Sequence, residues 1–116
     1  MNRHRAEKRG RHGEQLAVWY LRLKGYTILG QRIRTPRGEV DLVARRGRTI
    51  VFVEVKTRDT KAELDLAIDE RRLARVAAAA EALAPRYARQ GENIRIDVIL
   101  IARHCWPEHI ENAWIG

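Results

Sequence analysis

The sequence predicts an α/β domain in which a small mixed sheet is flanked by helices. Three observations support this fold class: an early helical apolar period, two strand-like segments joined by a glycine turn, and a second helical stretch that leads into another strand. The predicted element order is α-β-β-β-α-β. The 116 residues suit one domain, residues 13–116, preceded by a basic arm, residues 1–12, which we expect to be flexible.

The first predicted elements are a helix over residues 14–24 and a strand over residues 26–30. Apolar side chains recur at helical spacing on one face of the first segment, at Leu16, Trp19, Tyr20 and Leu23. Gly25 follows, as is common at the end of a helix. Residues 31–38 are basic and contain a proline, which predicts an irregular connection rather than a strand.

The next segments predict a hairpin and then a strand–helix–strand unit. Residues 38–44 and 49–57 alternate like strands around the turn at Gly47, so that residues whose numbers sum to 94 or 95 should lie opposite each other. Residues 59–90 have helical composition, and Pro85 should close the main helical run. The apolar positions that follow the helical period are Leu64, Ala67, Ile68, Leu73, Val76, Ala77, Ala80 and either Leu83 or Ala84. Residues 94–102 predict a strand parallel to the one over residues 49–57. The tail from Trp106 to Trp114 fits either a short helix or an edge strand.

The charge distribution favours a polyanionic partner. Residues 1–40 carry ten Lys and Arg against three Glu, and the whole chain has a net charge of +8. Nucleic acid is the first candidate partner, although an arginine-rich surface can also serve only solubility. The single cysteine, Cys105, favours a reducing compartment, and the apolar runs are too short to cross a membrane. We therefore expect a cytoplasmic protein with no membrane partner.

The hairpin carries charged residues that strands usually avoid. Alternation places Glu39, Asp41 and Val43 on one face of the first strand, and Val40, Leu42 and Ala44 on the other. It likewise places Ile50, Phe52, Glu54 and Lys56 together on one face of the second strand. The charged residues of this face gather at one end of the hairpin, where Asp41 comes within a step of Glu54.

Two converging carboxylates form an oxygen-ligand site of the kind that Mg²⁺ or Mn²⁺ prefers. Lys56 lies two residues after Glu54 on the same face, where its charge could stabilise a phosphate in the transition state. The competing interpretation is a solvated face with cross-strand Glu–Lys pairs. That alternative predicts charges along the whole face, whereas the rest of this face is apolar.

The segments Gly38–Val43 and Phe52–Arg58 resemble the D…ExK core motif of the PD-(D/E)XK nuclease superfamily. More narrowly, the chain resembles the YraN family (UPF0102), small bacterial proteins similar to archaeal Holliday-junction resolvases. The resemblance covers nearly the whole chain, including residues 10–21 of the first helix, residues 25–29 of the first strand, residues 95–98 and residues 109–113. It implies a restriction-endonuclease-like core and a metal-dependent endonuclease acting on structured or branched DNA.

The resemblance also implies roles for individual residues. Asp41 and Glu54 would bind Mg²⁺ or Mn²⁺ together with the backbone carbonyl of Val55, and Lys56 would be the catalytic lysine. Glu14 matches an acidic residue that resolvase-like members contribute from the first helix, although a helix-dipole interaction would equally explain an acid there. The arginines that fit as phosphate contacts are Arg34, Arg37 and Arg58.

Other positions are assigned more weakly or depart from the family pattern. Glu39 fits either a further ligand or a rim charge, and we expect Asp97 to pair with Arg95 or with a backbone group rather than with a metal. Family members commonly carry an asparagine where this chain has Arg32. They also carry a lysine early in the long helix, where this chain has Arg71 and Arg72.

Two other function classes remain open from the sequence. One is a nucleic-acid-binding module that keeps the nuclease fold without turnover. The other is an interaction protein that recognises a macromolecule through the tail with Trp106 and Trp114. By analogy with resolvases, the nuclease hypothesis also allows a homodimer that presents two sites.

Overall fold

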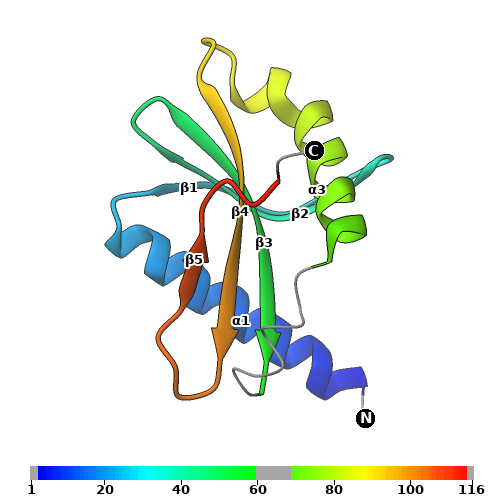
Figure 1. Cartoon of the computed structure of the whole chain (residues 1–116), viewed down its shortest axis with the longest axis vertical. Coiled ribbons are helices and arrows are strands. Elements are labelled where there is room, and N and C mark those ends of the chain that lie inside the picture. The colour runs from blue at the N-terminus through cyan, green and yellow to red at the C-terminus, as the bar shows by residue number, and fades with distance from the viewer. Residues whose placement is uncertain (1–2, 60–68, 115–116) are drawn as a thin grey trace.

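A computed structural model of the chain describes residues 3–59 and 69–114, with side chains from Arg11 onward. Within these residues the chain forms two helices and five strands (Figure 1). The helices are α1 (Arg3–Leu23) and α3 (Glu70–Tyr87); the strands are β1 (Thr27–Thr35), β2 (Gly38–Arg46), β3 (Thr49–Arg58), β4 (Asn93–Ala102) and β5 (Glu108–Ile110). None of the helices described is both long and apolar enough to cross a membrane.

The strands form one mixed sheet in the order β1-β2-β3-β4-β5. The β1/β2, β2/β3 and β4/β5 pairs are antiparallel, whereas β3 and β4 run parallel. The predicted α/β class, the element order and the parallel pair are therefore confirmed. The arrowheads of β3 and β4 point to the same end of the molecule, next to the N-terminal half of α1 (Figure 1).

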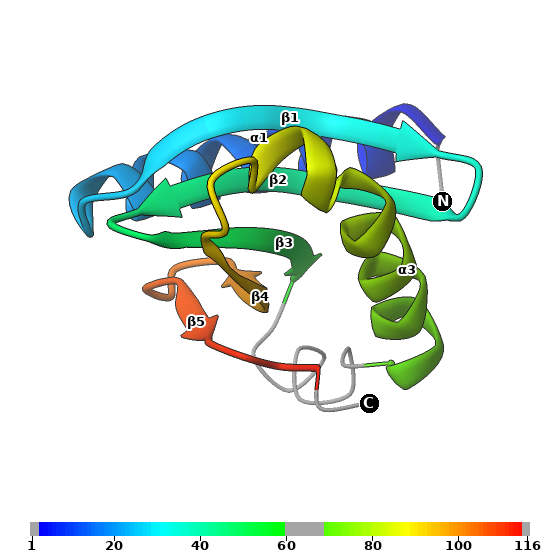
Figure 2. The same cartoon turned by 90° about the horizontal axis from the view of Figure 1, so that it is seen from above.

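The two helices lie on opposite faces of the sheet, each over its own apolar cluster (Figure 2). The cluster under α3 joins helix residues such as Leu73 and Val76 to Val43, Ile50 and Phe52 of the hairpin. The cluster under α1 contains Ala17, Val18, Leu21, Tyr26, Leu42, Ala44, Val51, Val53, Ile99 and Ile101. The sheet is thus buried on both faces, which explains the near-continuous apolar runs of its central strands.

Two N-terminal elements are longer than the sequence predicts. Helix α1 begins at Arg3 instead of Glu14, because the Arg, Ala, Glu and Lys residues of the basic segment are good helix formers. Strand β1 continues through residues 31–35, which were expected to be an irregular connection. These residues pair with β2, and Pro36 lies in the two-residue turn between the strands, where it removes no ladder hydrogen bond.

The C-terminal half also differs in detail from the prediction. Helix α3 is capped by Asp69, whose carboxylate accepts a hydrogen bond from the Arg71 N–H at 2.9 Å. The helix continues past Pro85 to Tyr87 instead of ending at the proline. The tail, for which the sequence left two possibilities, contributes the edge strand β5. The predicted helical positions Leu64, Ala67 and Ile68 lie outside the described residues.

The hairpin register follows the sum of 95, as predicted, from Leu42 opposite Val53 to Arg46 opposite Thr49. The predicted face of Val40 is wrong, because Val40 packs with Val43 and the cluster under α3 rather than with Leu42. The β2/β3 pairing stops before Asp41, while β2 stays paired with β1 down to Gly38. Simple alternation therefore fails where β2 leaves β3.

Two glycines allow both helices to approach this end of the hairpin. A Cβ atom at Gly13 of α1 would collide with the Thr57 side chain of β3. A Cβ atom at Gly38 would collide with the backbone carbonyl oxygen of Arg75 in α3. The absence of a side chain at each position therefore brings one helix from each face close to the ends of β2 and β3.

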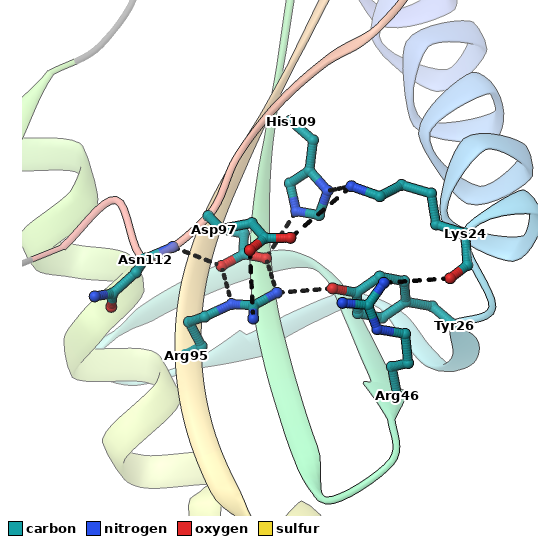
Figure 3. A network of polar contacts seen from close by, with 8 residues as sticks. Lys24, Tyr26, Arg46, Arg95, Asp97, His109 and Asn112 are labelled. Carbon is teal, nitrogen blue, oxygen red and sulfur yellow. Dashed lines mark hydrogen bonds and ion pairs between the residues drawn. The ribbon is translucent and has the colours of Figure 1, made fainter.

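A buried ionic network joins β4 to the C-terminal segment (Figure 3). Asp97 is fully buried and accepts two hydrogen bonds from the Arg95 guanidinium, at 2.8 and 2.9 Å. It also lies 2.8 Å from His109 Nε2 and accepts from the Asn112 N–H. Burial alone would raise the pKa of Asp97, but the hydrogen bonds from His109, Arg95 and Asn112 outweigh it and lower the pKa. The expected pairing of Asp97 with Arg95 is confirmed.

Replacing Asp97 by Asn should destabilise the fold by about 3 kcal/mol, because it leaves the half-buried Arg95 charge without its carboxylate. The free energy of unfolding from urea titrations measures this loss. Glu81→Gln is the matched control, since the Arg37–Glu81 ion pair is exposed and should contribute no more than about 0.5 kcal/mol. Equal losses in the two variants would contradict a structural role for the network.

Candidate functional site

The candidate site lies where the β2/β3 pairing ends. Asp41 Oδ2 accepts a hydrogen bond from the Val55 N–H at 2.7 Å. A side-chain carboxylate thus accepts a hydrogen bond from a backbone N–H of β3, just beyond the last β2/β3 backbone pair. This bond fixes Asp41 between the two strand ends, next to the residues that flank Val55.

Glu54 and Lys56 lie on the α3 side of β3, and both are buried. Lys56 Nζ is 3.3 Å from Glu54 Oε1, which confirms that the two side chains share a face. Arg72, in the first turn of α3, donates from Nε to the same Glu54 oxygen at 2.6 Å. Glu54 is therefore held by one cation from its own strand and one from the facing helix.

Burial and neighbouring charges shift the pKa of two groups at this site. Burial lowers the pKa of Lys56, the nearby Glu54 opposes that shift, and the Arg72 charge adds to it. Burial and the Glu54 charge raise the pKa of Asp41 to about 7, although the hydrogen bond from Val55 works in the opposite direction. Asp41 therefore lies within the field of Glu54, as the hairpin register predicted, and its ionised form is disfavoured.

Glu14 lies on the other side of Asp41, on α1. The Glu14 charge also raises the pKa of Asp41, so the two carboxylates repel each other electrostatically. Its Oε2 accepts a 2.7 Å hydrogen bond from Arg32 Nε, which holds Glu14 by an ion pair. Glu14 and Asp41 both line a hollow of about 360 Å³. Its other lining residues are Arg11, Arg32, Arg34, Glu39 and Val40.

The predicted ligand set is brought to one end of the sheet but does not form a ready metal cluster. Among residues 11–59 and 69–114, no three His, Cys, Asp or Glu side chains are grouped so that they could hold a metal ion. Asp41 lies between Glu14 on the α1 side and Glu54 on the α3 side. The donors available are thus Asp41 and Glu54, which lie in each other's field, but Glu54 is paired with Lys56 and Arg72, and the third carboxylate, Glu14, is paired with Arg32.

The predicted phosphate contacts are only partly at the site. Arg34 lines the hollow, is strongly exposed and lies 3.5 Å from Glu39. Arg37 instead pairs with Glu81 of α3, and the Arg58 guanidinium donates to the Thr57 carbonyl oxygen. Only Arg34 of the three therefore lines the hollow beside Asp41.

The contacts of two arginines are not predicted from the sequence. Arg72 and Arg32 depart from the family pattern, and the sequence does not indicate that each pairs with a site carboxylate. The crossover from β3 to β4 offered a signal for Arg72, because the helix of such a unit begins near the end of the first strand. Arg32 had no comparable signal, since it belongs to a segment that was expected to be irregular.

The raised pKa of Asp41 predicts a pH-dependent stability. Its ordinary value is 3.8, so between about pH 4 and pH 7 the folded protein binds more protons than the unfolded chain, and the free energy of unfolding falls as the pH rises. Asp41→Asn removes the titrating carboxyl. The free energy of unfolding of this variant should therefore rise relative to that of the parent by on the order of 1–3 kcal/mol across that pH range. Urea titrations in a metal chelator at several pH values measure the difference.

The control for that comparison is Glu39→Gln, which removes an exposed carboxylate two residues away. Its stability difference from the parent should change little with pH. If the Asp41→Asn difference is as flat as the control's, Asp41 is ionised normally in the folded protein.

Comparison with known proteins identifies the family. The sequence model of the family described as "Uncharacterised protein family UPF0102" matches residues 13–101. "UPF0102 protein" from Erythrobacter litoralis is 62% identical over 114 residues, and the one from Sphingopyxis alaskensis is 61% identical over 114 residues, with 98% of both chains covered in each case. A third, from Rhizorhabdus wittichii, is 60% identical over 117 residues and covers 100% of this chain and 99% of its own. The chain therefore belongs to the UPF0102 family.

Proposed function

We propose that this protein is a metal-dependent endonuclease of the PD-(D/E)XK type that hydrolyses phosphodiester bonds in structured or branched DNA. The observation that supports this most is the juxtaposition of Asp41, Glu54 and Lys56 where β2 and β3 part. Three features fit that chemistry: the D…ExK order of the residues, the electrostatic interaction between Asp41 and Glu54, and the lysine beside Glu54. The similarity to archaeal Holliday-junction resolvases is part of the same proposal.

The donor set fits Mg²⁺ or Mn²⁺. Asp41, whose pKa is raised by burial and then by the Glu54 charge, and Glu54 are oxygen ligands of the kind that a divalent cation prefers, and Mg²⁺ completes its shell with water. Asp41, Glu54 and the Val55 carbonyl would hold the ion, with Glu14 as a further carboxylate beside Asp41. When bound, the ion would polarise the phosphate and lower the pKa of an attacking water.

The protein's own residues would supply charge and position. Lys56 is held against Glu54 in a buried setting, where a fixed positive charge stabilises a developing negative charge more strongly than in water. Its lowered pKa also makes it easier for the amine to give up or exchange a proton. Arg34 at the hollow would contact the phosphate backbone. Arg37 and Arg58 lie outside the lining of that hollow and would have to leave their contacts with Glu81 and Thr57 to do the same.

A second candidate is a nucleic-acid-binding module without turnover. It is favoured by the fact that Lys56 and Arg72 already neutralise Glu54, and by the engagement of Glu14 by Arg32. This alternative predicts salt-dependent DNA binding without cleavage in any divalent cation. For both candidates we propose a cytoplasmic location, and a two-fold dimer with two sites would suit a branched substrate.

Cleavage assays separate the two candidates. The parent, incubated with junction, flap, single-stranded and duplex DNA in Mn²⁺ or Mg²⁺, should cut at least one substrate. Asp41→Asn, Glu54→Gln and Lys56→Met should each lower the rate by about 100-fold or more, because each removes a group that acts on the reacting phosphate. Glu92→Gln, which changes a partly exposed carboxylate just before β4, should keep the parent's rate.

The nuclease proposal fails if the parent cuts none of these substrates in either metal. It also fails if the three site variants cut as fast as the parent, since the activity would then come from a contaminant. Circular dichroism spectra show whether each variant is folded, so that a loss of activity caused by unfolding can be recognised.

Arg72 should compete with the metal for Glu54. Arg72→Gln removes the 2.6 Å contact with Glu54, so Mn²⁺ should bind about 3- to 10-fold more tightly than to the parent. Isothermal titration calorimetry measures this affinity. Arg75→Gln is the matched control, because Arg75 lies one turn later on α3 and lines the same small hollow as Glu54. Equal gains in the two variants would indicate a general charge effect and contradict the competition.

A further inference from the structure

A pair of exposed tryptophans stands beside the candidate site but takes no part in it. Trp19 of α1 is 49% exposed and Trp106, in the loop after β4, is 68% exposed. Their ring centroids are 5.9 Å apart, in an edge-to-face arrangement. Tyr20 also contacts Trp106, at 6.0 Å between ring centroids. We call Trp19, Tyr20 and Trp106 the aromatic platform.

The platform is anchored to the fold rather than loosely attached. Tyr20 contacts the His109 ring at 6.3 Å, and the Lys24 ammonium lies 5.3 Å from the Tyr20 ring centroid. Lys24 and His109 in turn belong to the network around Asp97. Trp106 is therefore held in place by rings that are themselves fixed, yet most of its surface stays in water. Single exposed apolar residues are ordinary, but a fixed cluster of large aromatic rings indicates a binding surface.

The charge around the platform selects the kind of partner. Residues 15–24 and 102–107, which carry the platform, contain Arg22, Lys24, Arg103 and His104 but no Asp or Glu. The flanking acids are Glu14, which pairs with Arg32, Glu108 at the start of β5, and Glu111, whose Oε1 lies 3.9 Å from Lys24 Nζ, so the cations left to meet a phosphate are chiefly Arg22 and Arg103. Aromatic faces with a cationic margin suit unpaired nucleotides, whose bases stack while their phosphates meet the cations. An uncharged apolar surface of a protein partner could contact the rings but would form no ion pairs with the cations beside them.

The platform and the candidate site lie at the same end of the sheet. Glu14 and Trp19 are both on α1, about 7.5 Å apart along the helix axis. Helix α1 rests on Thr57 at Gly13, and Arg58 pairs with Ala102, the last residue before the loop that carries Trp106. A strand bound at Asp41 and Glu54 could therefore continue over the platform.

We propose that the aromatic platform binds unpaired bases of a DNA strand and so directs the candidate site to substrates with a single-stranded arm. This inference rests on the proposed nuclease function for its biological sense, but the binding itself does not require cleavage. It narrows the substrate class from structured DNA to DNA in which an unpaired strand adjoins the cut.

The test compares two fluorescent oligomers in a chelator: a twelve-nucleotide oligothymidylate and an abasic strand of equal length. The two probes carry the same phosphates, so the ratio of their Kd values isolates base stacking from charge. The parent should prefer the oligothymidylate by about 5- to 100-fold, and Trp106→Ala should bring the ratio close to one. Trp106→Phe should retain most of the preference, and Ile94→Ala, an exposed apolar residue at the other end of β4, should keep the parent's ratio.

Several outcomes would overturn the platform. One is a parent that binds both probes equally, and another is a Trp106→Ala variant with the parent's ratio. A third is a parent dimer, seen by sedimentation, that Trp106→Ala dissolves while the probe ratio stays unchanged, because the patch would then bind a second copy of the chain. A parent that prefers the oligothymidylate but cuts no DNA substrate in Mn²⁺ or Mg²⁺ would refute the nuclease proposal alone and leave the platform standing.

Discussion

The hydrogen bond from the Val55 N–H to Asp41 determines the geometry of the whole candidate site. In a regular hairpin that donor would meet a backbone carbonyl, and β2 would stay beside β3. Here a side chain accepts it just beyond the last backbone pair of the two strands. The backbone of β2 can then leave β3 with β1, while the carboxylate remains beside Glu54. A strand end that would otherwise be sealed by pairing therefore becomes a place where charged groups meet.

The helices complete the site because the chain leaves room for them. Gly13 lets α1 lie against Thr57, which brings Glu14 towards Asp41 from one face. Gly38 lets α3 lie against the start of β2, and the first turn of α3 brings Arg72 to Glu54 from the other face. Larger residues at either glycine would push a helix away, and its charged side chain with it. The site thus depends on close backbone packing at two points where no functional group is present.

The features that could be predicted from the sequence are those governed by local periodicity. The 95-sum register, the shared face of Glu54 and Lys56, and the parallel β3/β4 pair follow from strand alternation and the crossover rule. The face of Val40 could not be predicted, because alternation assumes that β2 stays flat beside β3. The pairing of Arg32 with Glu14 depends on how far β1 extends, and the sequence suggested that β1 would stop earlier. Long-range contacts of flexible arginines are not encoded in any short pattern.

Two carboxylates of the same sheet, Asp97 and Asp41, have different surroundings and opposite pKa shifts. Asp97 is fully buried, yet it receives Arg95, His109 and the Asn112 N–H, and its pKa is lowered. Asp41 is partly buried, and burial together with the charges of Glu54 and Glu14 outweighs the hydrogen bond from Val55 and raises its pKa to about 7. The fold is therefore able to satisfy a buried carboxylate where one serves stability. Local rules are most often broken at functional sites, and a carboxylate whose ionised form is disfavoured is a candidate for binding a proton or a cation. The contrast with Asp97 is thus an argument, independent of any resemblance, that Asp41 is retained for binding rather than for stability.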